Sequence, residues 1–397
     1  MTGEAMAEAR RARWAVAAMF AANGFTMGAW APQIPLILPR LGITETTLGL
    51  LILGLGLGAV GAMLFSGRLI ARFGSRSVLR GFALALIPVL PAVVFSHSLA
   101  LTALTMAIFG AMAGCMDVAM NAQAVAIERR LGRAIMSSSH GFWSLGGFVG
   151  GSAGAFVIAQ LGAQGQALLA AATAAALVFG AMPFLLPDPP APRTAATTAA
   201  QRGTLFPRDA GLWLLGAMAL FSMVPEGAVL DWAALYLAKE LGSDLFRSGL
   251  GFAFFAGTMA LMRFAGDGLR NRFGAVRTLR VSGLLGAAGL MGGALAPVDT
   301  LAIASFALAG FGVANMVPIL FSAAGNHVGL PPGQAISTVT MVGYAGILIA
   351  PASIGWVAEH AGFRLTYAAV ALLLLLVAAL AGRAAAADGV AQTSPAT

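Results

Sequence analysis

Apolar runs of about twenty residues or more recur along the whole chain, separated by short polar turns, and each is long enough to cross a bilayer as a helix. We expect twelve such spans, at 14–39, 46–70, 79–97, 100–128, 136–160, 166–186, 210–238, 247–269, 278–296, 299–326, 334–358 and 364–384. The predicted fold class is therefore an all-α, polytopic membrane protein. Its predicted parts are an N-terminal six-helix half at 1–186, a cytoplasmic linker at 187–209, a C-terminal six-helix half at 210–384 and a flexible tail at 385–397.

One polar turn occurs twice. The segment RFGSRSVLR at Arg72–Arg80 returns 200 positions later as RFGAVRTLR at Arg272–Arg280, and Gly110 and Gly146 recur at the same offset as Gly310 and Gly346. Such a repeat predicts two structurally related halves around an axis along the membrane normal, with the binding site near the midplane between them.

Composition supports the membrane assignment, since 59% of the 397 residues are hydrophobic and 10% are charged, against about 25% charged in a soluble domain. Of the 23 Lys and Arg residues, 18 fall on the side that holds both termini and the linker. The positive-inside rule therefore makes both termini cytoplasmic, in a bacterial-type inner (plasma) membrane. Because the basic residues lie in these turns, the net charge of +8 does not indicate a nucleic-acid partner.

The repeated turn resembles the signature of the major facilitator superfamily. Between spans 2 and 3, that signature has a Gly, then an Asp followed by a basic residue, then a second Gly and further basic residues. The matching positions are Gly67, Arg72, Gly74 and Arg76 in the first copy and Arg272 and Gly274 in the second. Ala71 and Asn271 stand where the family has Asp. The resemblance implies a transporter with a cytoplasmic charge latch, here weakened or relocated, with Glu128 and Asp267 as the nearest acidic substitutes.

Two segments narrow this resemblance. Met116–Gly147 and Pro225–Leu237 are similar to the YbjJ-like bacterial inner-membrane branch, which lies near the fucose and other sugar/proton symporters.

Ionisable residues inside the predicted spans are costly to insert and are therefore functional candidates. Glu226 is the first of them, because it lies in Pro225–Gly227 and the proline removes a backbone donor close to mid-span. The equivalent span of the first half carries Asn23-Gly24 and further prolines, so we predict paired helix breaks beside a binding cavity. A structural Glu bonded to a neighbouring helix is the alternative.

Asp117 lies near the middle of its span with Asn121 on the same face, and the resemblance places spans 1, 4, 7 and 10 around one cavity. Hydrogen bonding between helices is the alternative for these polar residues. The candidates for binding substrate or protons are Glu226, Asp117, Asn121, Asp231, Asn23, Asn315, Trp232 and Tyr344. Asp231 could equally be solvated at the outer vestibule, and the two aromatic residues could equally be interfacial anchors.

Arg263 precedes Asp267 by one helical turn, so it either pairs with Asp267 at the membrane surface or contacts His140 or Asp117 and reports their proton state to a gate. The gating candidates are Arg263, His140, Asp267, Glu128, Arg72, Gly74, Arg272 and Gly274.

The sequence thus predicts a secondary active transporter of a small polar solute, sugar- or polyol-like, coupled to protons through Glu226 with help from Asp117. The alternatives are proton-driven efflux of drugs or metabolites and a membrane sensor or scaffold that transports nothing. We expect no enzyme activity, no cofactor and no metal, with the proton as coupling ion, the solute and the bilayer as partners, and a monomer.

Overall fold

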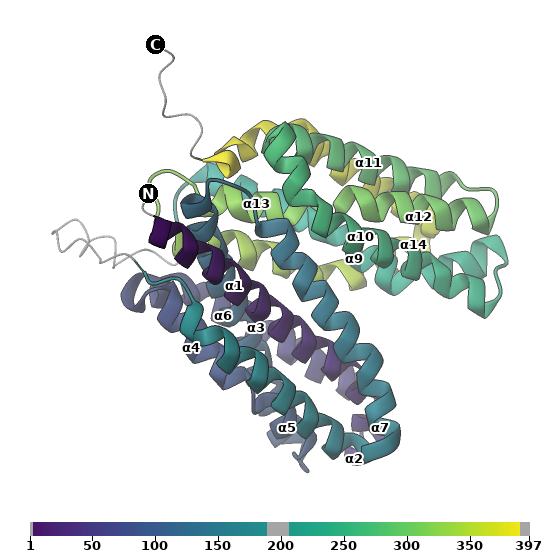
Figure 1. Cartoon of the computed structure of the whole chain (residues 1–397). Coiled ribbons are helices and arrows are strands. Elements are labelled where there is room, and N and C mark those ends of the chain that lie inside the picture. Colours follow the sequence, from purple (N-terminus) through teal and green to yellow (C-terminus); the bar gives the residue numbers. More distant parts are fainter. Residues whose placement is uncertain (1–2, 189–205, 390–397) are drawn as a thin grey trace. The chain divides into compact units, whose positions relative to one another are not determined.

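The computed structural model describes residues 3–188 and 206–389, and all the regular elements in this part of the chain are helices (Figure 1). Ten of the helical segments are long and apolar enough to cross a membrane. The chain forms two compact units, one of Met1–Ile135, Ser139–Pro207 and Gly329–Thr338, the other of Met136–Ser138, Arg208–Val328 and Val339–Thr397. Two helices therefore begin in one unit and continue in the other.

The first unit is built on a long central helix, α6, which packs against α1, α3 and α4. Its elements are α1 (Gly3–Trp30), η1 (Ala31–Gln33), α2 (Ile34–Leu41), α3 (Glu45–Phe73), α4 (Ser75–Leu86), α5 (Val89–Val94), α6 (Leu99–Leu131), α7 (Met136–Ala181) and η2 (Met182–Phe184).

In the second unit, α12 lies alongside α10 and α11, and α9 packs against α10 (Figure 1). Its elements are α9 (Ala210–Leu241), α10 (Leu245–Phe273), α11 (Ala275–Leu295), α12 (Asp299–Val313), α13 (Met316–Gly325), α14 (Pro332–Ala379) and η3 (Leu380–Asp388). The first turn of α7 clusters with this unit, and the first turn of α14 clusters with the other.

The sequence repeat extends to the backbone. Gly74 and Gly274, which separate α3 from α4 and α10 from α11, have φ of 81° and 79°. Gly162 and Gly362 break α7 and α14 with φ of 71° and 81°. Because such φ values are costly for residues with a Cβ, glycine at these matched positions sets the same helix junction twice.

The predicted helix breaks are only partly correct. The prolines after Trp30 do end α1, which passes into the short turn η1. The predicted break at Asn23-Gly24 is wrong, because α1 continues through it. Pro225 likewise lies inside α9 without ending it. A break that the sequence did not predict separates α12 from α13 at Ala314 and Asn315.

Close packing explains the glycine in α1. A Cβ built on Gly24 or Gly28 would overlap the carbonyl oxygen of Trp143 or Gly147 in α7. These glycines therefore allow two helix backbones to approach, as small residues do in membrane proteins.

Gly28→Ala should consequently lower the free energy of unfolding by about 1 to 3 kcal/mol, the usual cost of overpacking. Thermal unfolding in detergent measures the loss. The matched control is Gly54→Ala in α3, where an added Cβ meets nothing within 4 Å. Equal midpoints for the two variants would contradict the role of Gly28 in packing.

The C-terminal prediction needs correction. Residues 385–388, assigned above to a flexible tail, belong to η3, in which Ala387 is buried. Residues 390–397 of the predicted tail and 189–205 of the predicted linker lie outside the described residues.

Candidate functional site

A polar cluster in the first unit joins α1, α6 and α7. The indole Nε1 of Trp143 donates to Asn23 Oδ1 at 2.9 Å, and Asn23 Nδ2 donates to the carbonyl oxygen of Ala113 at 3.2 Å. About two turns further along α6, Asn121 Oδ1 lies 3.2 Å from His140 Nε2. Of the sequence-predicted candidates, the structure thus joins Asn121 to His140 and bonds Asn23 to Trp143, in each case between two helices.

Asp117 belongs to the same face of α6. Its backbone oxygen accepts from Asn121 Nδ2 at 2.9 Å, and the residue is only 4% exposed. Its side-chain oxygen Oδ2 is buried and accepts no hydrogen bond from any residue in the described part of the chain. A buried carboxyl with spare acceptor capacity can bind a proton or a donor group of a ligand.

In the second unit, Glu226 of α9 pairs with Arg263 of α10, with Oε2 and Nη2 3.4 Å apart. The Arg263 side chain is 9% exposed, whereas the Glu226 side chain keeps 39% of its surface exposed. The pair combines a buried cation with a carboxylate that is open on one side. The sequence predicted both residues as functional, but it did not pair them with each other.

Asp267 binds the N-terminus of a helix. Its carboxylate accepts from the backbone nitrogens of Ser137 and Ser138 at 2.9 and 3.0 Å, and from the Ser138 hydroxyl. These bonds, here termed the α7–α10 latch, satisfy donors in the first turn of α7 and place a negative charge at the positive end of the helix. The sequence predicted Asp267 as an acidic substitute in the latch, and that role stays a prediction.

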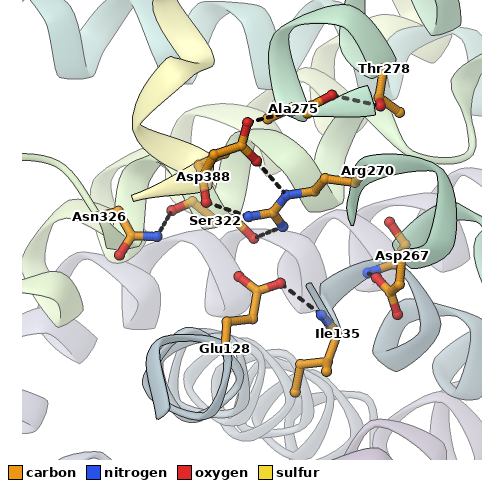
Figure 2. Close-up of polar contacts among 12 residues, drawn as sticks. Glu128, Ile135, Asp267, Arg270, Ala275, Thr278, Ser322, Asn326 and Asp388 are labelled. Atoms are coloured by element: carbon orange, nitrogen blue, oxygen red, sulfur yellow. Dashed lines mark hydrogen bonds and ion pairs between the residues drawn. The ribbon is translucent and has the colours of Figure 1, made fainter. Parts of the chain in front are cut away.

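A second ionic cluster surrounds Arg270, which the sequence did not single out (Figure 2). The buried guanidinium donates to Ser322 Oγ at 2.8 Å, to the carbonyl oxygen of Ala387 and, from Nε, to Asp388 Oδ1 at 3.4 Å. The other carboxylate oxygen of Asp388 accepts from the backbone nitrogen of Ala275 at 2.6 Å. Arg270 therefore fixes η3 to α10 and α13.

Asp188 is the counterpart of Asp388 in the first unit. Its carboxylate accepts from the backbone nitrogens of Ser75 and Arg76 at 2.8 and 2.9 Å, and from the Ser75 hydroxyl at 2.7 Å. Both copies of the repeated turn thus receive a carboxylate from the end of their unit rather than from positions 71 and 271. The sequence did hold a signal, since Asp188 and Asp388 obey the 200-residue offset.

The other gating candidates have local contacts. Glu128 Oε1 accepts from the backbone nitrogen of Ile135 at 2.9 Å and so closes the turn between α6 and α7 (Figure 2). The guanidinium groups of Arg72 and Arg272 each lie over the ring of the next residue, 5.0 and 5.2 Å from its centroid. Neither arginine is buried.

The remaining binding candidates are spread over the second unit. Asn315 is 0% exposed, at the break between α12 and α13, and its amide lies where a side chain on Gly266 would have to go. Neither amide atom has a hydrogen-bond partner among the described residues. Asp231 is exposed, Trp232 lies 6.0 Å from Phe363 between ring centroids, and Tyr344 is half-buried in α14.

Within residues 3–188 and 206–389, no group of three or more His, Cys, Asp or Glu side chains is arranged to hold a metal ion.

One ion pair lies outside the spans, where Asp209 precedes α9. Its Oδ2 is 3.0 Å from His327 Nε2, and its Oδ1 accepts from Leu212 N at 2.9 Å. The hydrogen bond with His327, followed by that with Leu212, lowers the pKa of Asp209 below its usual value. A carboxylate with a lowered folded-state pKa stabilises the fold above its unfolded pKa of about 3.9. That contribution disappears as the pH falls through the lowered folded value.

Asp209→Asn should therefore unfold at a lower temperature than wild type at pH 6, and the difference should shrink as the pH falls below about 4. Thermal unfolding in detergent across this range measures it. His327→Gln, which keeps the Asp209 carboxylate, should weaken the pH dependence. Identical curves for wild type and Asp209→Asn would exclude this role.

Comparison with known proteins adds the following similarities. A family profile described as Major Facilitator Superfamily matches residues 16–332. An uncharacterized MFS-type transporter of Yersinia pestis is 37% identical over 366 residues, which cover 90% of this chain and 92% of the relative. Among solved structures, the E. coli fucose:proton symporter FucP aligns with a TM-score of 0.69 at 17% identity, over 92% of this chain and 98% of the other. The human organic anion transporter MFSD10 aligns with a TM-score of 0.72 at 17% identity, over 94% and 99%.

Proposed function

The chain belongs to the major facilitator superfamily, and on that premise we propose that it is a proton-coupled secondary transporter of a small polar solute that works by alternating access. Membership makes it a multi-pass membrane transporter. The coupling ion, the class of solute and the inner-membrane location are parts of the proposal.

The observation that carries proton coupling is the pair formed by Glu226 and Arg263. A coupling carboxyl must be accessible to protons, and the loss of its charge must change the energy of a neighbouring group. Glu226 meets both conditions, because part of its side chain is exposed while its partner Arg263 is buried. Removing the charge of Glu226 takes away the carboxylate charge that pairs with the buried guanidinium of Arg263, and breaking a buried ion pair from one side is costly enough to drive a rearrangement. Asp117, buried and with an open acceptor oxygen, is the second proton candidate.

A polar, hydroxyl-rich solute such as a sugar or polyol fits the neutral groups of the first unit. Amide and indole groups are the side chains that bind and stack on such molecules, and Asn23, Asn121 and Trp143 supply them. The fucose:proton symporter among the structural neighbours is consistent with this class. At 17% identity it supports the fold alone.

The proposal includes the topology predicted above, with twelve helices, cytoplasmic termini and a monomer in the bilayer. Ten spans satisfy both length and hydropathy. The two other proposed spans are α1, which begins with several charged residues, and the first part of α7, residues 136–155. The break at Gly162 divides α7 into two helices, as the repeat requires.

Reconstitution into proteoliposomes tests the function. With an imposed pH gradient, a panel of hexoses, pentoses and polyols should include one that accumulates and carries protons with it, detected by a trapped pH-sensitive dye. Accumulation that does not depend on the pH gradient would exclude proton coupling. Proton-linked movement of lipophilic cations instead of sugars would establish the efflux alternative.

A further inference from the structure

The first turns of α1 expose a face that carries basic and aromatic side chains. Trp14 lies four positions after Arg10 and three after Arg11, so both arginines are its neighbours on the helix surface, and all three residues are exposed. They are here termed the α1 basic face. The other side of the same turns packs into the first unit, where Ala9 and Ala12 are 0% exposed.

Trp14 is held in place although it is 64% exposed. The ring of Phe142 in α7 meets the indole edge-on, with the ring centroids 6.0 Å apart and the planes at 81°. The guanidinium of Arg13 lies over the indole, 5.2 Å from its centroid. These contacts restrict the rotamers of a large apolar side chain that remains outside the core. An exposed indole fixed in this way is typical of a residue that lies at a membrane–water interface.

The acidic residues of this segment do not neutralise the α1 basic face. Glu8 pairs with Arg130 of α6, with Oε2 and Nη1 3.0 Å apart. Glu4 precedes Arg10 by six residues, which is about 9 Å along the helix axis. The face therefore carries net positive charge beside an exposed indole.

The second unit has no such face at the start of α9. The positions that match Arg10, Arg11 and Trp14 at the 200-residue offset are Ala210, Gly211 and Leu214. The repeated architecture thus forms without these side chains, so a purely structural need of the fold does not account for them.

The spacing along α1 matches the thickness of a headgroup layer. Trp14 is the first residue of the span expected at 14–39, and the two arginines precede it by about 5 Å along the helix axis. The polar layer of each leaflet is about 5 to 7 Å thick. With the indole at the boundary between headgroups and acyl chains, the guanidinium groups lie at the level of the phosphates, which arginine can bind with two parallel hydrogen bonds.

We propose that the α1 basic face is a binding site for an anionic phospholipid in the leaflet on the side of the N-terminus. Arg10 and Arg11 bind the phosphate, and Trp14 packs against the glycerol and the upper part of an acyl chain. An anionic lipid is preferred to phosphatidylcholine, because the ammonium group of choline is repelled by two neighbouring guanidinium groups. From the proposed function the inference takes only that α1 spans the bilayer.

Native mass spectrometry of the full chain in detergent tests the site, by titration with phosphatidylglycerol or phosphatidylcholine. Wild type should bind phosphatidylglycerol with the lower Kd. Arg10→Gln with Arg11→Gln should raise that Kd about fivefold for each arginine removed and leave the Kd for phosphatidylcholine unchanged. The matched control is Arg277→Gln with Arg280→Gln, because these arginines are exposed on α11, a helix without tryptophan. It should bind phosphatidylglycerol as tightly as wild type.

A second pair of variants tests the indole. Trp14→Leu should raise the Kd for phosphatidylglycerol several-fold, because the flat ring that packs against the lipid is lost. Trp356→Leu is the matched control, since Trp356 is also 64% exposed but stacks on His360 in α14, and it should leave the Kd unchanged. Thermal unfolding of each variant checks that it is folded.

Three results would overturn the inference. They are an unchanged Kd for phosphatidylglycerol after the loss of Arg10 and Arg11, an equal rise in the Arg277 and Arg280 control, and displacement of the lipid by millimolar inorganic phosphate, which would show a site for free anions. The titration needs no transported solute. Lipid binding in a protein that moves no solute with protons would refute the proposed function alone, whereas proton-coupled transport without lipid preference would refute only the lipid site.

Discussion

Glu226→Gln is expected to abolish solute accumulation driven by a pH gradient while leaving solute exchange down a concentration gradient. Glutamine has nearly the same shape and keeps an oxygen that can accept from Arg263, but it cannot take up a proton. Since Arg263 is buried and lies 3.4 Å from Glu226, the variant fixes the pair in the state that lacks the carboxylate charge. The ratio of internal to external solute should fall to about one, as binding without proton coupling dictates.

The measurement is uptake into proteoliposomes with and without the gradient, followed by counterflow of labelled solute. Asp231→Asn is the matched control, because Asp231 is on the same helix but exposed. It should retain concentrative uptake. Concentrative uptake by Glu226→Gln equal to that of wild type would remove Glu226 from the coupling mechanism.

The parts of the fold that the sequence predicted depend on local signals. Long apolar runs separated by basic turns indicate spanning helices, because hydrocarbon satisfies no backbone polar group. Gly74 and Gly274 were recognisable as a repeated junction, and both have the positive φ that such a junction needs. Family membership followed from the same turn and is confirmed by the family profile and the relatives.

Predictions failed where packing between helices overrides local preference. Gly24 indicated a break in α1, but it allows α1 to approach Trp143 of α7, and the helix continues. Pro225 is accommodated in α9 for reasons that the sequence does not contain. The break at Ala314 and Asn315 does have a signal in the sequence, because Pro318 has no N–H to bond to the carbonyl oxygen of Ala314.

Ion pairing was the hardest feature to predict, since a partner chosen across the fold has no signature in local spacing. Asp267 was identified as acidic and near a latch, yet its partners Ser137 and Ser138 lie about 130 positions away. Arg263 had several possible partners at the level of sequence, and the structure adds Glu226 to them. Asp188 and Asp388 lie more than 100 residues after the turns that they bind, so the pattern of the turn alone does not identify them.

Arg270→Met should be among the most destabilising substitutions in the second unit. It removes the buried donors to Ser322 and to the carbonyl oxygen of Ala387, and it leaves Asp388 without its cation (Figure 2). Each buried acceptor left unsatisfied costs about 1 to 3 kcal/mol, whereas the partly exposed Asp388 contributes less because water screens it.

We therefore expect the midpoint of thermal unfolding in detergent to fall by several degrees, roughly in line with a loss of about 2 to 4 kcal/mol, and η3 to become susceptible to limited proteolysis. Arg272→Met is the matched control, because Arg272 is exposed and lies over Phe273, and it should change the midpoint little. If both variants unfold at the same temperature and resist protease equally, Arg270 does not hold η3 in place. Because η3 supplies Asp388 to the N-terminus of α11, its release should also weaken the second copy of the repeated turn.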